Sequence, residues 1–168
     1  MSILIDKAKA EDAQALLDFT KICGSETDNL SFGNEGILMS VEEEAAYLGS
    51  LQNSDTDIFL VAKDGDEIVG TANYSAFTRN RFSHRGTLGI SVRKAYWNQG
   101  IGTMLMTEIL DFAKNIAKSE IVSLEVRSDN EPAIHLYKKF GFEKVGTFRG
   151  FFKINGEMID YDIMELLL

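Results

Sequence analysis

The chain has 168 residues, of which 45% are hydrophobic and 26% charged, so it is long enough for one domain whose core needs neither disulfides nor metals. Its single cysteine, Cys23, excludes an intramolecular disulfide, and no cluster of Cys and His has the spacing of zinc ligands. The net charge of −9 argues against a nucleic-acid partner, because phosphate backbones require a basic face, and it favours a cationic substrate.

The N-terminal segment Met1–Gln14 alternates apolar and charged residues and lacks the apolar centre of a signal peptide. No apolar run approaches the length that spans a membrane. We therefore expect a cytoplasmic protein that has no membrane partner.

The first third of the chain is predicted to contain a strand at Ile3 and Ile5, followed by a helix through Ala13, Leu16 and Leu17. Ser40-Val41-Glu42-Glu43 is a capping box that opens a second helix, whose apolar stripe comprises Val41, Ala45, Leu48 and Leu51.

The segment between these helices, Gly24–Ser40, is polar and contains glycines. Loops of this length are uncommon inside a compact domain unless they serve a function, so we interpret it as a flap on the substrate side. A mobile surface connection is the alternative.

Three strands are expected next. Ile58–Lys63 and Glu67–Phe77 form a hairpin around Asp64-Gly65-Asp66, and a further strand covers Arg85–Val92. The last apolar stretch of that strand, Leu88–Val92, leads into a glycine-containing turn.

That turn, Tyr96-Trp97-Asn98-Gln99-Gly100-Ile101-Gly102-Thr103, precedes an amphipathic helix over Ile101–Ala117. Glycines between a strand and a helix let backbone N–H groups approach an anion without interference from Cβ atoms. The helix adds unpaired N–H donors and the positive end of its dipole. The pattern predicts a cradle for a pyrophosphate.

Two nucleotide-binding motifs fit this turn poorly. A dinucleotide fingerprint requires a third glycine where Leu105 stands, and no Asp or Glu ends a following strand at the expected distance. A P-loop requires Gly-Lys followed by Ser or Thr, which is absent near the turn.

A second motif follows the next strand, Ile121–Arg127, which runs parallel to its predecessor because a helix crosses between them. Asn130 is a suitable N-cap, Pro132 occupies the first turn, and Gly141 can end the helix in a left-handed conformation. Tyr137 falls on the buried stripe of this short helix, where its hydroxyl needs a partner. A plain core position is the alternative interpretation of Tyr137.

The chain is predicted to end in an antiparallel pair, Phe142–Phe152 and Met158–Leu166, that turns at Asn155-Gly156. No linker, repeat or low-complexity tract interrupts residues 1–168, so we expect one α/β domain.

Both motifs resemble those of the GNAT N-acetyltransferases. The family's coenzyme A loop, Arg/Gln-x-x-Gly-x-Gly/Ala, is present as Trp97-x-x-Gly100-x-Gly102, with Trp97 in place of a polar residue. The run Asn130–Phe142 matches the family's Asn-x-x-Ala-x-x-Leu-Tyr-x-Lys-x-Gly-Phe pattern at every fixed position. The resemblance extends over the whole chain in its elements, although the first third contains no fixed motif.

This resemblance implies the GNAT fold: a mixed, mostly antiparallel sheet of seven strands with helices on both faces and a splay between the fourth and fifth strands. It implies acetyl-CoA as co-substrate and no metal. The expected contacts of the coenzyme are Ser91 and Val92 at the strand end, where one backbone N–H serves as the oxyanion donor. The others are the turn from Trp97 to Thr103, with Asn130 and Tyr137 beside it. In the family, the residue matching Tyr137 lies beside the coenzyme sulfur and protonates it.

The sequence leaves several candidates for the general base that deprotonates the amine. Leu124-Glu125-Val126-Arg127 resembles the N-terminal acetyltransferases of ribosomal proteins, in which the matching Glu deprotonates the amine. Glu125 can equally be a surface carboxylate paired with a neighbouring Lys or Arg. Other acids that could serve are Glu26, Asp28, Asp160 and Asp162, with His84 near the flap as a further base; His135 is expected to face solvent.

The expected activity is direct transfer of an acetyl group from acetyl-CoA to a primary amine, on a small molecule or a protein N-terminus. Cys23 has no His partner nearby in sequence, so an acyl-enzyme is not expected. The alternative is a non-catalytic module of the same fold that senses acyl-CoA or binds a partner. Dimers are common among proteins of this kind, so the resemblance also allows a homodimer.

Overall fold

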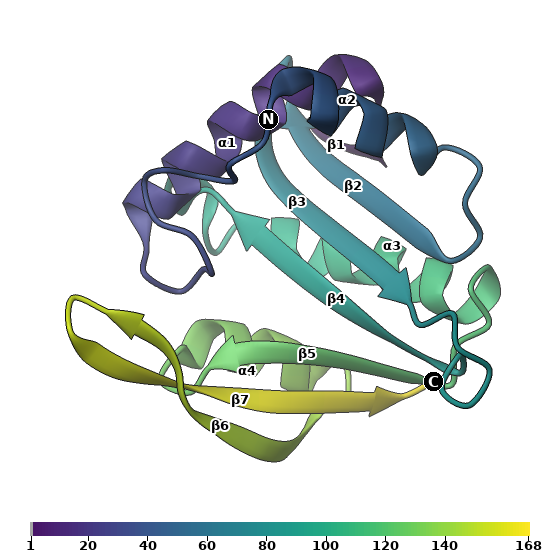
Figure 1. Cartoon of the computed structure of the whole chain (residues 1–168), viewed down its shortest axis with the longest axis vertical. Helices are drawn as coiled ribbons and strands as arrows, with labels where there is room; N and C mark the ends of the chain where they lie inside the picture. Colours follow the sequence, from purple (N-terminus) through teal and green to yellow (C-terminus); the bar gives the residue numbers. More distant parts are fainter. Residues whose placement is uncertain (1) are drawn as a thin grey trace.

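The computed structural model describes residues 2–168 and contains one seven-stranded sheet in the order β1-β2-β3-β4-β5-β7-β6 (Figure 1). Its strands are β1 (Ile3–Lys7), β2 (Asp57–Asp64), β3 (Glu67–Ala76), β4 (Arg85–Val92), β5 (Ile121–Arg127), β6 (Glu143–Ile154) and β7 (Glu157–Leu167). The helices are α1 (Ala13–Glu26), α2 (Val41–Ser50), α3 (Ile101–Asn115) and α4 (Glu131–Lys139), with 3-10 turns at Ala10–Asp12 and Lys94–Tyr96.

Neighbouring strands pair antiparallel except for β4 and β5, which are parallel. Their pairing is confined to Arg85–Thr87 opposite Ile121–Ser123, so the remaining residues of the two strands have no ladder partner across this boundary. Figure 1 shows the two strands diverging from that end. The expected fold, with its splay between the fourth and fifth strands, is confirmed.

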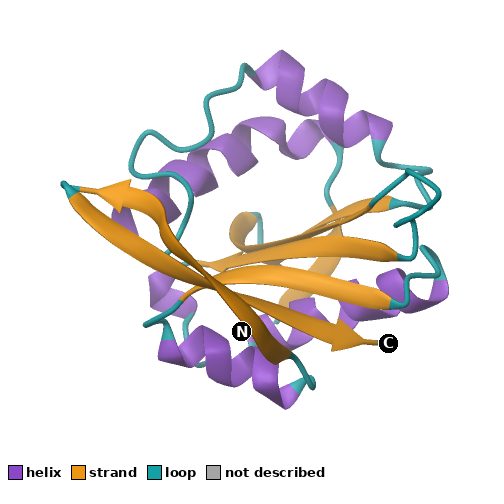
Figure 2. Cartoon of the chain, turned by 60° about the horizontal axis from the view of Figure 1, so that its bottom comes forward, coloured by secondary structure: helices purple, strands orange, loops and turns teal. Residues whose placement is uncertain are grey.

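Helices cover both faces of the sheet (Figure 2). One core forms where α3 and α4 pack on the sheet, and a second, smaller core lies under α1 and α2. The apolar stripe of α3 explains the first core, because Ile101, Leu105 and Ile109 are all at most 1% exposed.

Gly70 on β3 lets the start of α3 approach the sheet closely. A Cβ atom at this position would lie 3.2 Å from both Ile101 Cγ2 and Leu105 Cδ1, which is tighter than ordinary packing. The first turn of α3, and with it the preceding glycine turn, is therefore held directly against the middle of the sheet.

The first third differs from the expected pattern in two details. α1 continues to Glu26, so the predicted flap begins at Thr27 rather than Gly24. The capping box of α2 is present, with Ser40 Oγ accepting from Glu43 N, but the buried stripe is different. Val41 is 36% exposed, whereas Glu44 is 6% exposed beside the fully buried Leu48.

The C-terminal hairpin turns at Asn155 and Gly156, as predicted, and both residues have positive φ angles of 51° and 85°. The register between β6 and β7 shifts between Phe148 and Phe152. This irregularity accompanies a cluster of aromatic rings from Phe148, Phe151, Phe152 and Tyr161.

Candidate active site

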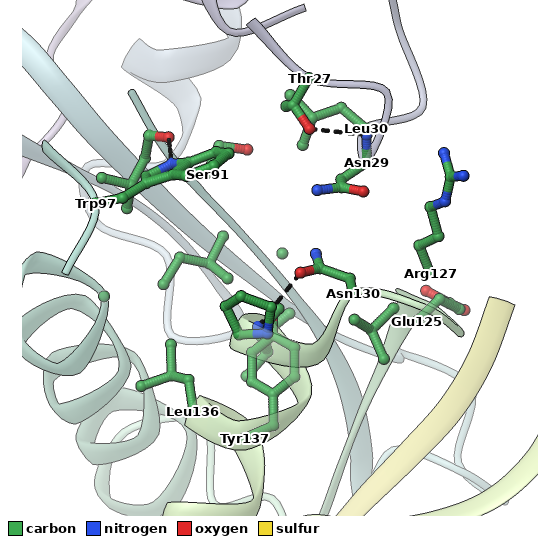
Figure 3. A pocket seen from close by; sticks show the side chains of 18 of the residues that line it. Thr27, Asn29, Leu30, Ser91, Trp97, Glu125, Arg127, Asn130, Leu136 and Tyr137 are labelled. Atoms are coloured by element: carbon green, nitrogen blue, oxygen red, sulfur yellow. Dashed lines mark hydrogen bonds between the residues drawn. The ribbon is translucent and has the colours of Figure 1, made fainter. Parts of the chain in front are cut away.

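A cavity of about 1190 Å³ lies at the splay. It is lined by the outer half of β4, the glycine turn, β5, α4, the segment after α1, and the C-terminal hairpin. Figure 3 shows Thr27, Asn29 and Leu30 on one side of this cavity, opposite Tyr137 and Leu136 of α4, with Glu125 and Arg127 projecting from β5.

The glycine turn presents an open row of donors. Asn98 and Gly100 have φ angles of 61° and 83°, and a Cβ atom on Gly100 would meet nothing within 4 Å. Among the described residues, no hydrogen bond uses the backbone N–H groups of residues 98–103, and the first recorded bond runs from Met104 N to Gly100 O at 3.0 Å. These consecutive unpaired donors at the start of α3 form a site for an anion.

The side chains of this turn brace it rather than fill the site. Trp97 Nε1 donates to Val92 O at 2.7 Å, and Gln99 Nε2 donates to Ala95 O at 2.9 Å. Trp97, Asn98 and the run from Gly100 through Ile101 and Gly102 to Thr103 line the cavity, whereas Gln99 does not. Trp97 therefore replaces a polar side chain with an indole that fastens the turn to the end of β4.

Ser91 and Val92 both line the cavity, but their backbone N–H groups point in opposite directions from β4. Arg93 N donates to Val69 O at 2.9 Å, so Arg93 directs its backbone groups towards β3. Because backbone groups alternate in direction along a strand, the backbone of Ser91 also faces β3. The backbones of Val92 and Ile90 face the gap between the diverging strands β4 and β5. Of the two residues expected to supply the N–H for an oxyanion, only Val92 presents it there.

Tyr137 is 6% exposed and packs against Phe142 with ring centroids 6.0 Å apart. No hydrogen bond joins its hydroxyl to another described residue, and no fully inaccessible side-chain oxygen among them lacks a partner. The hydroxyl is therefore open to the cavity that Tyr137 lines. Burial raises the pKa of this phenol, which keeps it protonated at neutral pH.

Asn130 places α4 at the cavity. Its side chain caps the helix by accepting from Ala133 N at 3.4 Å, as the sequence predicts, and Pro132 lies in the first turn. Both residues line the cavity, as does the exposed His135.

Glu125 is exposed and lines the cavity between the buried Leu124 and Val126. No ion pair within residues 2–168 involves its carboxylate, so the predicted pairing with a neighbouring Lys or Arg is not observed. Its backbone also faces the gap between β4 and β5. Ser128 N donates to Asp160 O, so Ser128 faces β7, and because backbone groups alternate in direction along β5, Glu125 faces the opposite side.

The other candidate acids and bases serve elsewhere. Glu26 accepts from Lys94 N at 2.7 Å and pairs with Arg93, and Asp160 accepts from Gly150 N at 2.8 Å. Burial raises the pKa of Asp162, but hydrogen bonds from Ser128, Thr147 and Lys144 outweigh it and hold that pKa below its usual range. None of these three acids lines the cavity, and neither does Asp28.

Two further residues are also outside the site. His84 does not line the cavity, because it precedes the end of β4 that is paired with β5; its carbonyl accepts from Glu120 N and Ile121 N. The expectation that it lies near the flap is wrong for this reason. Cys23 is 1% exposed, and burial raises the pKa of its thiol to about 12, so it is not a nucleophile.

The structure adds contacts that the sequence did not predict. Arg127 pairs with Asp129 at 2.6 Å and donates to Asp28 O at 3.4 Å, and Tyr161 Oη donates to Asn29 O at 2.9 Å. The segment Glu26–Asn29 is thus fastened to the end of β4 on one side and to β5 and β7 on the other. Phe151 and Phe152 complete the wall of the cavity, and their only sequence signal was the density of aromatic residues in β6.

The sequence profile described as the Acetyltransferase (GNAT) family matches residues 26–142. The chain belongs to this family. It is similar to the L-amino acid N-acetyltransferase AaaT of Escherichia coli (38% identical over 97 residues, 58% of this chain and 59% of that protein). The N-alpha-acetyltransferase RimI of Mycobacterium tuberculosis is 37% identical over 98 residues, covering 58% of this chain and 60% of RimI. The chain thus spans about three fifths of each of these relatives.

A solved GNAT acetyltransferase from Streptococcus pneumoniae superposes with a TM-score of 0.95 and 34% identity, covering 99% of this chain and all of that one. Within residues 2–168, no helix is long and apolar enough to cross a membrane. No group of three His, Cys, Asp or Glu side chains in that range could hold a metal ion.

Proposed function

We propose that this GNAT protein is an N-acetyltransferase that uses acetyl-CoA and acylates a primary amine directly. The observation that carries the proposal is the run of unpaired N–H groups over residues 98–103, which adjoins the unpaired edges of β4 and β5 and the open hydroxyl of Tyr137. The diphosphate, the pantetheine arm and the sulfur of one ligand need these three features in one cavity.

The cradle fits a diphosphate because its donors are unpaired and converge at a helix N-terminus, where the dipole favours negative charge. Asn98 to Thr103 would hold the phosphates through their backbone. The replacement of a polar residue by Trp97 does not remove any of these donors.

The splay fits an extended chain that carries amide groups. Ile90 on β4 and Glu125 on β5 direct backbone donors and acceptors into the gap between the two strands without a ladder partner. Val92 adds its N–H, because its carbonyl already accepts from Trp97 Nε1. A pantetheine arm has two amides and could pair with these edges as a short strand does. Ser91, whose backbone is already paired with β3, would contribute only side-chain contact.

Acetyl-CoA supplies the acetyl group as a thioester, whose carbonyl carbon accepts the amine. Val92 N–H would donate to the carbonyl oxygen as that oxygen gains negative charge. Tyr137 would donate its proton to the departing sulfur, a role suited to a phenol that burial keeps protonated. Glu125 would accept the proton of the attacking amine, directly or through one water.

The acceptor is an amine of a small molecule or of a protein N-terminus, and the names of the two curated relatives refer to acylation of amino acids and of N-alpha groups. The exposed carboxylate of Glu125 and the net charge of −9 both favour a cationic acceptor. We place this activity in the cytoplasm, and an association into homodimers is compatible with it.

Release of free thiol from acetyl-CoA, measured over a panel of primary amines, tests the proposal. Tyr137→Phe should lower kcat at least tenfold with little change in acetyl-CoA affinity, because only the proton is lost. Tyr47→Phe is the matched control, since Tyr47 lies on α2 outside the cavity and its variant should retain full activity.

Two outcomes would count against the proposal. If acetyl-CoA binds but no amine releases thiol, the chain is a coenzyme-binding module. If Tyr137→Phe is fully active, the sulfur receives its proton from another group.

A further inference from the structure

A second cavity, of about 100 Å³, lies under α1 and α2 and adjoins the candidate active site. The two cavities share Phe32, Asn73 and Ser91 in their linings. Ser91 and Asn73 lie on the paired strands β4 and β3, so the two cavities adjoin at this part of the sheet.

Glu44 is the one charged residue in the lining of this second cavity. It is 6% exposed, and its carboxylate takes part in no hydrogen bond or ion pair with another residue of the described range 2–168. None of the fully inaccessible side-chain oxygens there lacks a partner, so the unpaired Glu44 oxygens are not completely enclosed by protein, and Glu44 lines the cavity.

A carboxylate in this position is unfavourable for the fold alone. Glu44 occupies the buried stripe of α2 one turn before Leu48, where an apolar side chain would pack without losing hydration. Leu17, Phe19 and Phe59 form apolar walls around it, and burial raises the pKa of Glu44. A buried carboxylate of this kind is stabilised when a cation pairs with it.

The size and lining of the cavity define what can enter. A cavity of about 150 Å³ accommodates a benzene molecule, so one of about 100 Å³ has room for roughly three or four heavy atoms. Apolar walls with one carboxylate match a short aliphatic chain that ends in an ammonium group.

We propose that this cavity is an acceptor subsite, in which Glu44 binds the second, distal ammonium group of a short diamine or basic amino acid whose other amine is acetylated. This proposal rests on the proposed acetyltransferase activity and specifies its substrate class. Asn73 and Ser91, which line both cavities, mark the path along which the aliphatic chain of the acceptor runs.

The test compares kcat/KM for α,ω-diamines of two to six carbons with that for the monoamines of the same length, using the full chain and saturating acetyl-CoA. We expect one diamine length to exceed its monoamine at least tenfold. Glu44→Gln should reduce that ratio to near one. Glu42→Gln, an exposed change on the same helix, should leave the ratio and the activity as they are.

A second variant distinguishes a specific effect on the subsite from a general loss of folded protein. Glu44→Asp draws the carboxylate back by one methylene, so the preferred diamine should become one carbon longer. Thermal unfolding of each variant checks that the protein remains folded.

The inference fails if the wild-type protein shows no preference for any diamine, or if Glu44→Gln lowers kcat equally for every amine, as loss of a general base would. Either result leaves the proposed acetyltransferase activity intact, because that activity is measured with the monoamines. Absence of turnover with all amines would instead contradict the proposed function. In that case, calorimetry with 1,4-diaminobutane and the coenzyme-loaded protein still tests the subsite.

Discussion

Replacing Gly100 by alanine tests whether the backbone of the glycine turn binds the coenzyme. Gly100 has a φ of 83°, and a non-glycine residue in the left-handed region costs about 1–2 kcal/mol. A Cβ atom at this position would meet nothing within 4 Å, so the substitution adds backbone strain without a steric clash.

The strain at Gly100 should appear as lost affinity. The N–H groups of residues 98–103 form no hydrogen bond among the described residues. The free turn is restrained only by the bond from Met104 N to Gly100 O and by the side chains of Trp97 and Gln99, so it can relax from the strained conformation at Gly100. Binding must then restore it, and about 1–2 kcal/mol corresponds to a roughly 5- to 30-fold higher Kd for acetyl-CoA. Isothermal titration calorimetry measures this change directly.

Gly156→Ala is the matched control. Gly156 has a φ of 85° and equally open surroundings, but it lies in the hairpin turn between β6 and β7. This variant should lower the melting temperature by roughly 2–8 °C and leave acetyl-CoA affinity unchanged. Equal affinities for the Gly100→Ala variant and the wild type would refute the assignment of this turn as the diphosphate cradle.

Three further substitutions probe the acceptor side. Glu125→Gln should lower kcat about 10²- to 10⁴-fold at neutral pH, and this loss should become smaller as the pH approaches the pKa of the amine. The control Glu157→Gln, at an exposed position, should have no effect. A loss of kcat that does not depend on pH would contradict the role of Glu125 as a base. Tyr161→Phe removes the bond to Asn29 O and should raise KM for the amine roughly 2- to 10-fold, with KM for acetyl-CoA unchanged as the check. Glu44→Gln should raise the melting temperature at pH 7, because the raised pKa of Glu44 means that its charged form opposes folding. This gain should vanish below about pH 4, where the carboxyl is protonated in both the folded and unfolded states; an equal gain at both pH values would contradict this reasoning.

Local chemistry allowed much of this structure to be predicted from the sequence. Gly100 and Gly102 identified the turn, Asn130 and Gly141 bounded α4, and Asn155-Gly156 fixed the last hairpin, because each depends on a few adjacent residues. The order of strands followed from these boundaries together with the resemblance to the GNAT family.

The remainder depends on contacts between distant segments. The difference between Ser91 and Val92 follows from the register of β4 against β3, which no local pattern specifies. The apolar stripe of α2 predicted Val41 as buried, because hydrophobic periodicity does not allow for a carboxylate on that face. Glu44 occupies the buried face because the side chains of α1, β2 and β3 leave a cavity there.

The site residues that could be predicted from the sequence lie mostly on the side of the cavity that would hold the coenzyme, and those that could not lie mostly on the side that would hold the acceptor. Residues that would hold the coenzyme lie on β4, the glycine turn and α4, where one ligand of fixed shape needs one backbone geometry. Residues that would surround the acceptor come from the segment after α1, from α2 and from the C-terminal hairpin, which meet only through tertiary contacts such as that of Tyr161 with Asn29. Acceptor specificity can therefore change by substitutions at Glu44 or in the hairpin without disturbing the cradle, since these elements share no hydrogen bond with residues 98–103 among the residues described.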